Sequence, residues 1–338
     1  MIRKSIIIGG VEIRPGERKT FDIAVARLYT HTDMTIPITV IHGVEEGPTL
    51  FICAAIHGDE IQGVEIIRRL LKLENLKNIK GTLIAIPVVN VFGFINQTRY
   101  SPDRRDLNRF FPGTDSGSLT SQLAKLFMEE IIEKCTHGID LHTGSNHRTN
   151  LPQIRAYLDD PETEKLAKAF GAPVILDANL LGGSLRQAVK DIGIPVLLYE
   201  AGEVLRFDEV SIQAGINGIL AVMSEIKMMQ LDQHTESTIT PLIAHSSTWV
   251  RAPISGILRN KIELGQSVSE NEILGVVSDP FGDDEENVIA GASGIIIGQL
   301  KLPLVYKGDA VFHIAKFDSK SAAKNTIEAF RQEFEPET

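Results

Sequence analysis

Nearly continuous apolar runs alternate with amphipathic segments over the first two thirds of the chain. The runs cover residues 50–56, 81–90, 136–144, 172–178 and 195–202, and runs of this kind are typical of strands buried on both faces of a sheet. The segments between them repeat apolar residues at helical spacing, at 61–73, 118–135, 185–192 and 211–229 and after Asp160-Pro161. This succession predicts an α/β fold, with a mainly parallel or mixed sheet and helices on both of its faces.

Two other stretches have a different pattern. Residues 1–48 contain short apolar segments separated by turn residues, which predicts a β-rich amino-terminal extension. Residues 91–117 form a long polar loop between a predicted strand and a predicted helix. Loops of this length inside a compact domain are usually functional, so we expect this one to contribute to a site.

The pattern changes again after Met229. Residues 231–240 are a polar linker, and short strands punctuated by glycine follow it. Residues 250–277 and 288–315 repeat one arrangement of turn, strand, glycine turn and strand, which resembles a biotinyl/lipoyl-like barrel-sandwich domain. Such carrier domains hold a modified lysine in the hairpin between their two halves. The hairpin here, DPFGDDEEN, has no lysine, so a swinging-arm role is not expected.

These patterns predict three parts in the chain. A catalytic domain with its β-rich extension covers residues 1–235, a biotinyl/lipoyl-like β-rich domain covers 241–318, and a helix with an acidic tail covers 319–338. A chain of this length can bury a substantial core in each of the two domains. We expect the second domain to narrow the cleft of the first or to support a homo-oligomer.

Composition excludes several classes of partner. Of the 338 residues, 43% are hydrophobic and 23% are charged, as in ordinary globular proteins. The formal net charge of −10 argues against binding to nucleic acids or anionic membranes, because both are polyanions. No apolar run approaches the length of about 18 residues that a membrane span needs, and no signal peptide is expected. With only two cysteines, the sequence predicts a cytoplasmic protein without a cysteine-based metal site.

Two histidines and a glutamate are candidate metal ligands. His57 and Glu60 follow the first buried strand at a spacing of three, and His142 closes the strand GIDLH. Because the carboxyl ends of parallel strands meet at one edge of a sheet, these side chains can converge into a two-histidine, one-carboxylate set with an open position. Asp140, two residues earlier on the face of His142, can orient that imidazole. The alternative for His57 is an ordinary surface histidine, and for Glu60 a first-turn glutamate that the helix dipole stabilises. The alternative for His142 is a hydrogen-bonded histidine at the end of a strand.

Further candidate residues are a glutamate at the end of another strand and a group of arginines in the long loop. Glu200 ends the strand PVLLYE, where a carboxylate either pairs with an arginine or acts as a base on metal-bound water. The loop at 91–117 contains Arg99, Arg104, Arg105 and Arg109, and the last of these ends the tetrapeptide DLNR before FFPG. A solvated charged surface is the usual explanation of such a cluster, but this pattern is more specific than a run of charge.

Four motifs together resemble a known family. HGDE, the Asn-Arg of RDLNRFFPG, the histidine of IDLHTG and the glutamate of LLYEAGE occur in the order and spacing of the succinylglutamate desuccinylase/aspartoacylase family. That family belongs to the zinc carboxypeptidase-like enzymes. The resemblance covers roughly residues 45–225 by motif and extends through the β-rich carboxyl-terminal part by architecture.

The resemblance implies a metal site and a base. One Zn²⁺ per chain would be held by His57, Glu60 and His142, and Glu200 would act as general base. It further implies that Asn108 and Arg109 clamp the substrate carboxylate.

The resemblance also implies, less specifically, roles for three arginines and a tyrosine in the substrate pocket. Arg99 would stabilise the oxyanion, and Arg105 is the alternative because the loop is slightly longer here than in aspartoacylase. Arg186 would bind a second substrate carboxylate. Tyr306 would close the pocket, unless it is an ordinary strand tyrosine.

The sequence therefore predicts a zinc-dependent amidohydrolase. Its expected substrate has a free carboxylate beside the scissile amide, either a small anionic N-acylamino acid or a peptide carboxyl terminus. One alternative is a carboxypeptidase-like enzyme that trims peptides or glutamate-rich tails. Another is a catalytically silent binding protein on the same fold.

Overall fold

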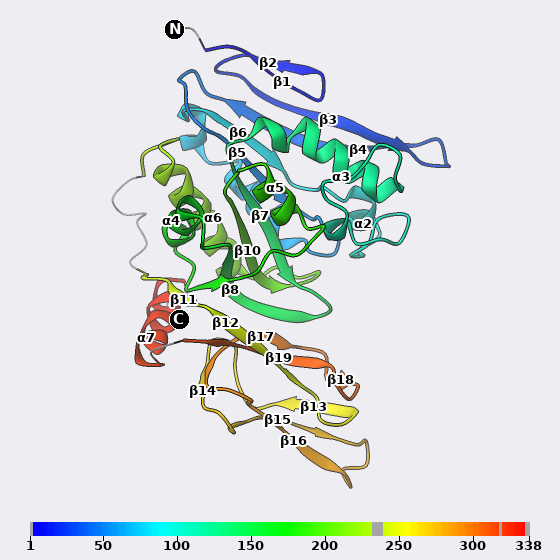
Figure 1. Cartoon of the computed structure of the whole chain (residues 1–338), viewed down its shortest axis with the longest axis vertical. Coiled ribbons are helices and arrows are strands. Elements are labelled where there is room, and N and C mark those ends of the chain that lie inside the picture. The colour runs from blue at the N-terminus through cyan, green and yellow to red at the C-terminus, as the bar shows by residue number, and fades with distance from the viewer. Residues whose placement is uncertain (1–2, 232–238, 318–319, 335–338) are drawn as a thin grey trace.

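Figure 1 presents the computed structural model, which describes residues 3–231, 239–317 and 320–334. Most of the predicted linker at 231–240 and the end of the predicted tail, 335–338, lie outside the described residues.

A mixed sheet forms the centre of the molecule. Four parallel strands are adjacent in the order β10, β7, β5, β6, with bounds Val196–Glu203, His137–Gly144, Thr49–Ala54 and Thr82–Ile86. Antiparallel strands extend both edges: β4 (Asp33–His42) and β3 (Arg18–Arg27) beyond β6, and β8 (Arg148–Ala156) beyond β10. A separate hairpin joins β1 (Ile6–Ile8) to β2 (Val11–Ile13).

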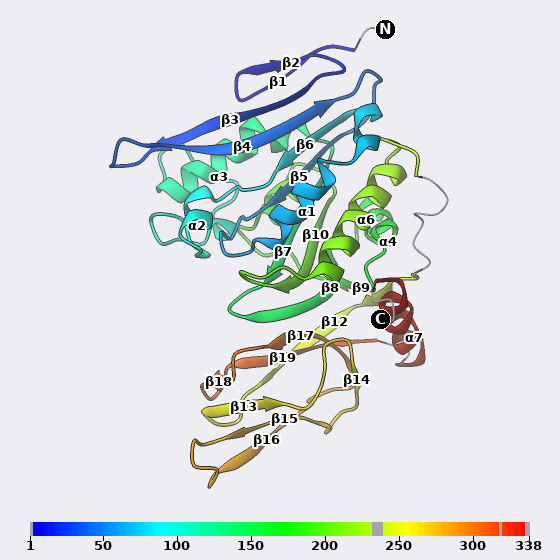
Figure 2. The ribbon, with the colours of Figure 1, turned by 180° about the vertical axis from the view of Figure 1, so that it is seen from behind.

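Helices cover both faces of this sheet, as the sequence predicted. One core contains apolar residues of α1 (Gln62–Leu70), α4 (Pro161–Phe170) and α6 (Glu209–Glu225), which Figure 2 shows together on one side. The other core contains those of α3 (Leu119–Glu130) and α5 (Leu185–Asp191), which face the viewer in Figure 1. Side chains cap two of these helices: Ser118 Oγ accepts from Ser121 N, and Asp160 Oδ2 accepts from Thr163 N.

One central strand differs from the sequence prediction. Residues 148–156, expected to belong to a loop, form β8 between β10 and the carboxyl-terminal strands. Proline interrupts most strands because it has no N–H to donate. Pro152 is accommodated because β8 changes partners there: on the edge away from β10 it pairs with β17 (Gly294–Leu300) up to Asn150 and with β9 (Val174–Asp177) from Gln153.

The predicted loop at 91–117 also contains local structure. Helix α2 (Val91–Ile95) follows directly after β6, and a 3-10 turn, η2, covers Leu107–Arg109. Two further 3-10 turns, η1 (Glu74–Asn78) and η3 (Ile132–Lys134), follow α1 and α3.

The carboxyl-terminal part is β-rich, as predicted, and its strands continue the central sheet. Strands β17, β19 (Ala310–Lys316) and β12 (Ser246–Arg251) extend the sheet beyond β8, with β14 (Ser267–Val268) beside β17 and β11 (Leu242–Ala244) beside β9. A second sheet has the order β16 (Glu285–Ile289), β15 (Ile273–Ser278), β13 (Gly256–Asn260) and β18 (Leu304–Val305). Helix α7 (Lys320–Phe334) ends the described chain. Strands from both sides of the predicted domain boundary thus belong to one continuous sheet.

None of the helices in the described ranges is long and apolar enough to cross a membrane.

Candidate active site

The turn after β5 positions the first two candidate ligands. Ala55 adopts a left-handed conformation with φ of 51°, which turns the chain out of the strand toward His57. Gly58 then lies against helix α2, where an added Cβ would come within 1.9 Å of the Gly93 carbonyl carbon. Only glycine therefore fits between His57 and the acidic residues of HGDE. This contact fixes the turn against the start of the long loop.

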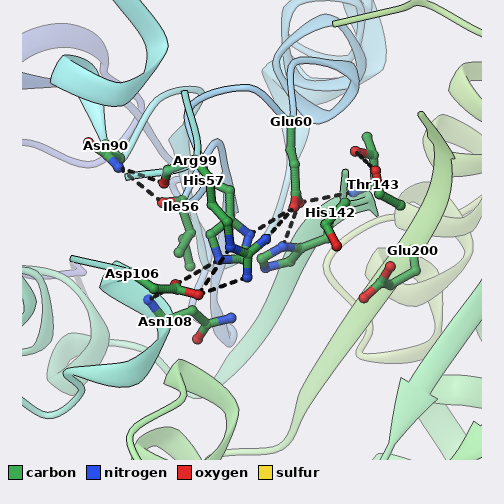
Figure 3. A network of polar contacts seen from close by, with 12 residues as sticks. Ile56, His57, Glu60, Asn90, Arg99, Asp106, Asn108, His142, Thr143 and Glu200 are labelled. Atoms are coloured by element: carbon green, nitrogen blue, oxygen red, sulfur yellow. Dashed lines mark hydrogen bonds and ion pairs between the residues drawn. The ribbon is translucent and has the colours of Figure 1, made fainter. Parts of the chain in front are cut away.

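His57, Glu60 and His142 converge at the carboxyl end of the parallel strands. One ligand atom from each lies within 4.8 Å of those of the other two. Glu60 Oε1 lies 2.9 Å from His57 Nδ1, and Glu60 Oε2 lies 2.8 Å from His142 Nδ1 (Figure 3). All three side chains are buried, with exposures of 5% or less. A set of two imidazoles and one carboxylate in this arrangement matches the donors that zinc prefers.

Each imidazole is oriented by its own carboxylate. His57 Nε2 lies 3.0 Å from Asp106 Oδ1, and His142 Nε2 lies 2.9 Å from Asp140 Oδ2. A carboxylate that accepts a hydrogen bond from Nε2–H leaves the Nδ1 lone pair of each ring free for a cation. The donor set therefore fits a divalent metal ion.

The electrostatics of the cluster are strongly coupled. Burial opposes ionisation of Glu60, but the neighbouring His57 and His142 hold the pKa of this carboxyl well below its usual range. Burial likewise opposes protonation of His142, but Asp140 and Glu60 raise its pKa well above the ordinary value. The carboxylate and the two imidazoles therefore stabilise one another's charged forms in this buried cluster.

Arg99 joins this cluster from the long loop. Its Nη2 lies 2.8 Å from Asp106 Oδ2, and its Nη1 lies 3.3 Å from Glu60 Oε1. Asn90, which caps α2, donates to the carbonyl oxygens of Ile56 and Arg99 at 3.4 Å and so ties the two turns together (Figure 3). Arg105 is placed differently: it packs over the Phe110 ring at 5.3 Å and does not line the pocket.

Asn108 and Arg109 lie at the edge of the same pocket. Asn108 Oδ1 accepts from Leu185 N at 2.9 Å, which fixes the start of α5. Arg109 Nη1 donates to the Asn108 carbonyl oxygen at 2.6 Å, and Arg109 forms no ion pair with a described carboxylate. Its guanidinium therefore has unused donors at the pocket.

Glu200 is held beside the histidines by strand register. It is paired with His142 across the parallel strands β10 and β7. Its Oε2 accepts from Asn150 Nδ2 at 2.5 Å, and its Oε1 lies 3.7 Å from Arg155 Nε. Both partners come from β8.

A pocket of about 260 Å³ contains these side chains. Its lining includes the three clustered residues, Glu200 and five arginines, at 99, 109, 148, 155 and 186. Burial lowers the pKa of Arg186 to about 10, and Arg186 Nη1 is buried without a hydrogen-bond partner. Tyr306 does not line the pocket and is 78% exposed.

Several residues of the site escaped the sequence analysis. Asp106 stands in the quoted DLNR pattern, but its contact with His57 spans 49 positions and has no local signal. Asn150 and Arg155 lie on the strand that Pro152 concealed. Trp249 reaches the pocket from β12, so the carboxyl-terminal strands do contribute to it.

Comparisons with known proteins point to one family. The succinylglutamate desuccinylase/aspartoacylase catalytic domain matches residues 46–226. The N-alpha-acetyl-L-2,4-diaminobutyric acid deacetylase of Halomonas elongata is 28% identical over 255 residues, which are 72% of this chain and 74% of the relative.

Solved structures agree with this match. A succinylglutamate desuccinylase/aspartoacylase from Rhodobacter sphaeroides superposes with a TM-score of 0.80 at 26% identity, covering 89% of this chain and 96% of that one. The ectoine utilization protein EutE from Ruegeria pomeroyi, in a product-bound structure, has the same fold, with a TM-score of 0.79 at 24% identity over 88% and 94% of the two chains.

Proposed function

Because the chain belongs to the succinylglutamate desuccinylase/aspartoacylase family, we propose that it is a zinc-dependent amidohydrolase that cleaves small N-acylated amino acids. The observation that carries this proposal is the buried cluster of His57, Glu60 and His142, in which each imidazole turns Nδ1 toward Glu60 and Nε2 toward a separate carboxylate. One zinc ion per chain would be held by these three residues. A zinc ion bound there would supply Lewis acidity for the substrate carbonyl and for a water molecule.

Glu200 is the proposed general base. Its pairing with His142 puts a carboxylate next to the metal ligands without making it one of them. In this role Glu200 accepts a proton from the attacking water and returns it to the nitrogen of the leaving amine. The carbonyl carbon gains an oxygen, the C–N bond breaks, and a free acid and a free amino acid result.

The arginines of the long loop have two proposed roles. Arg99, held by Asp106 beside Glu60, donates to the carbonyl oxygen as negative charge develops on it. Arg109 with Asn108 grips the free carboxylate of the substrate, because a guanidinium offers paired donors to a planar anion. Arg186, with its unpartnered Nη1, is the proposed contact for a second anionic group. Arg105 and Tyr306 lie away from the pocket and are not given a role here.

The size of the pocket favours a small substrate over a peptide. A volume of about 260 Å³, bounded by Trp249 and Leu181, lies just below the roughly 300–1,000 Å³ of typical small-molecule sites. The predicted cytoplasmic location and homo-oligomer remain predictions.

A hydrolysis panel tests this proposal. Zinc-loaded protein is incubated with N-acetyl, N-succinyl and N-formyl amino acids beside short α- and γ-glutamyl peptides. We expect release of free amino acid from at least one acylamino acid at rates well above those for every peptide. Cleavage of the peptides alone would instead favour the carboxypeptidase-like alternative.

A further inference from the structure

Asn150 connects the carboxyl-terminal strands to Glu200. It lies on β8, where it is paired with Gly202 of β10 on one side and with Gly298 of β17 on the other. Its side chain is buried, and its Nδ2 donates to Glu200 Oε2 at 2.5 Å. A single side chain thus bridges the strand of the proposed base and a strand from beyond residue 290.

This bond determines the position of Glu200. Within the described chain it is the one hydrogen bond made by the Glu200 carboxylate, because Arg155 Nε at 3.7 Å is too distant for a second. A glutamate has three rotatable side-chain bonds, so an unbonded carboxylate at a pocket wall would occupy several rotamers. The Asn150 amide selects one of them and leaves Oε1 free of hydrogen bonds.

Strand β17 leaves room for the Asn150 amide. A Cβ built on Gly298 would lie 3.1 Å from Asn150 Oδ1 and 3.1 Å from His313 Cβ. Such contacts are tighter than ordinary packing, so the absence of a side chain at Gly298 leaves room for this amide. The His313 ring in turn stacks on Trp249 with 4.2 Å between centroids. Strand β17 thus pairs with β8 at Asn150 and leaves space for its amide.

We propose that Asn150 is a positioning residue for Glu200 and that β17, through Gly298, holds Asn150 in place. This inference rests on the proposed function, in which Glu200 is the base. If Asn150 has this role, the carboxyl-terminal strands help to position the proposed base. A purely structural Asn150 would instead fasten β8 between its neighbours and act on stability alone.

A double-mutant cycle distinguishes the two roles. Asn150→Ala should lower kcat by about 10–100-fold, the usual cost of a hydrogen bond to a charged group, with KM and zinc content within twofold of the parent. In the Glu200→Gln background the same change should cost less than about twofold, because Asn150 then has no base to position. Equal losses in both backgrounds, or full activity of Asn150→Ala, would overturn the inference.

Two further variants guard against a folding defect. Asn150→Leu roughly keeps the size and the neutral charge of the side chain but removes the N–H donor, so it should also lose activity while the protein remains folded, as its melting curve would show. Gly298→Ala should lower kcat several-fold by displacing the amide, whereas Gly291→Ala, where an added Cβ meets nothing within 4 Å, should not. A fully active Gly298→Ala enzyme would refute the part assigned to β17.

The cycle also separates this inference from the proposed function. If Glu200→Gln alone retains full activity, the assignment of the base fails. If Glu200→Gln is inactive and Asn150→Ala is not, only the positioning role fails.

Discussion

Glu200 and His142 occupy paired positions on the adjacent parallel strands β10 and β7, so their side chains project from the same face of the sheet. His142 Nδ1 faces Glu60 Oε2 at 2.8 Å, and its Nε2 faces Asp140 Oδ2 at 2.9 Å. The clustered donor atoms of the described residues do not include Glu200. This register therefore places a carboxylate beside a candidate metal ligand without making it part of the ligand cluster.

Replacing Glu200 tests that separation directly. Glu200→Gln is nearly isosteric, so the fold and the zinc content should be unchanged while kcat falls by at least about 10²-fold. Glu203→Gln is the matched control on the same strand, since Glu203 faces His147 at 3.4 Å and does not line the pocket. An inactive control beside an active Glu200 variant would reassign the base.

Removing either orienting carboxylate should weaken the metal site. Asp106→Asn and Asp140→Asn each replace the charged acceptor of one imidazole with a neutral amide, and we expect zinc affinity to fall by about 10–100-fold. Competition with a chromogenic chelator measures the affinity. Asp103→Asn serves as the control, because Asp103 caps the Thr120 region and touches none of the ligands. Unchanged affinity in both Asp106 and Asp140 variants would mean that these carboxylates only stabilise the fold.

The proposed contact between Arg109 and the substrate carboxylate predicts a loss of activity that is confined to substrates with a free carboxylate. Arg109→Lys removes a paired donor and should lower kcat/KM by about 10–150-fold on substrates with a free carboxylate. Substrates whose carboxylate is amidated should be affected little. Arg105→Lys should be silent on both, since Arg105 lies outside the pocket. Equal losses on free and amidated substrates would show that Arg109 serves the fold.

His313 predicts a loss of stability in acid. Burial lowers the pKa of His313 to about 3, whereas an unfolded histidine titrates near 6.5. As the pH falls below about 6.5, the unfolded chain gains a proton that the folded chain excludes, so stability decreases down to about pH 3. His313→Gln should reduce the loss between pH 7 and 4.5 by about 2 kcal/mol in urea unfolding. His31 is exposed, so the His31→Gln variant should lose as much stability between pH 7 and 4.5 as the parent does.

Sequence patterns predicted the parts of the fold that depend on local order. Continuous apolar runs and helical spacing predicted the sheet and the helices on its two faces, because strands buried on both faces consist almost entirely of apolar residues. They missed β8, since Pro152 is tolerated only where the strand changes its partner, a circumstance that depends on the tertiary structure.

The site, like the fold, has features that the sequence predicts and features that depend on the tertiary structure. The convergence of His57, Glu60 and His142 could be anticipated because parallel strands bring their carboxyl ends to one edge. The contacts of Asp106 with His57 and of Asn150 with Glu200 span 49 and 50 positions, and no periodicity reports them. The choice between Arg99 and Arg105 likewise depended on how the long loop folds. Side chains that support a site through distant contacts thus require the structure.

Metal-dependent hydrolysis is the most direct test of the account. Protein stripped by a chelator is titrated with Zn²⁺ while hydrolysis of the best acylamino acid from the panel is followed. The account predicts that stripped protein is inactive and that activity rises in proportion to bound zinc, ending at one ion per chain, and that His57→Ala shows no such rise. Full activity of the stripped protein, or zinc-dependent activity that survives His57→Ala, would contradict it.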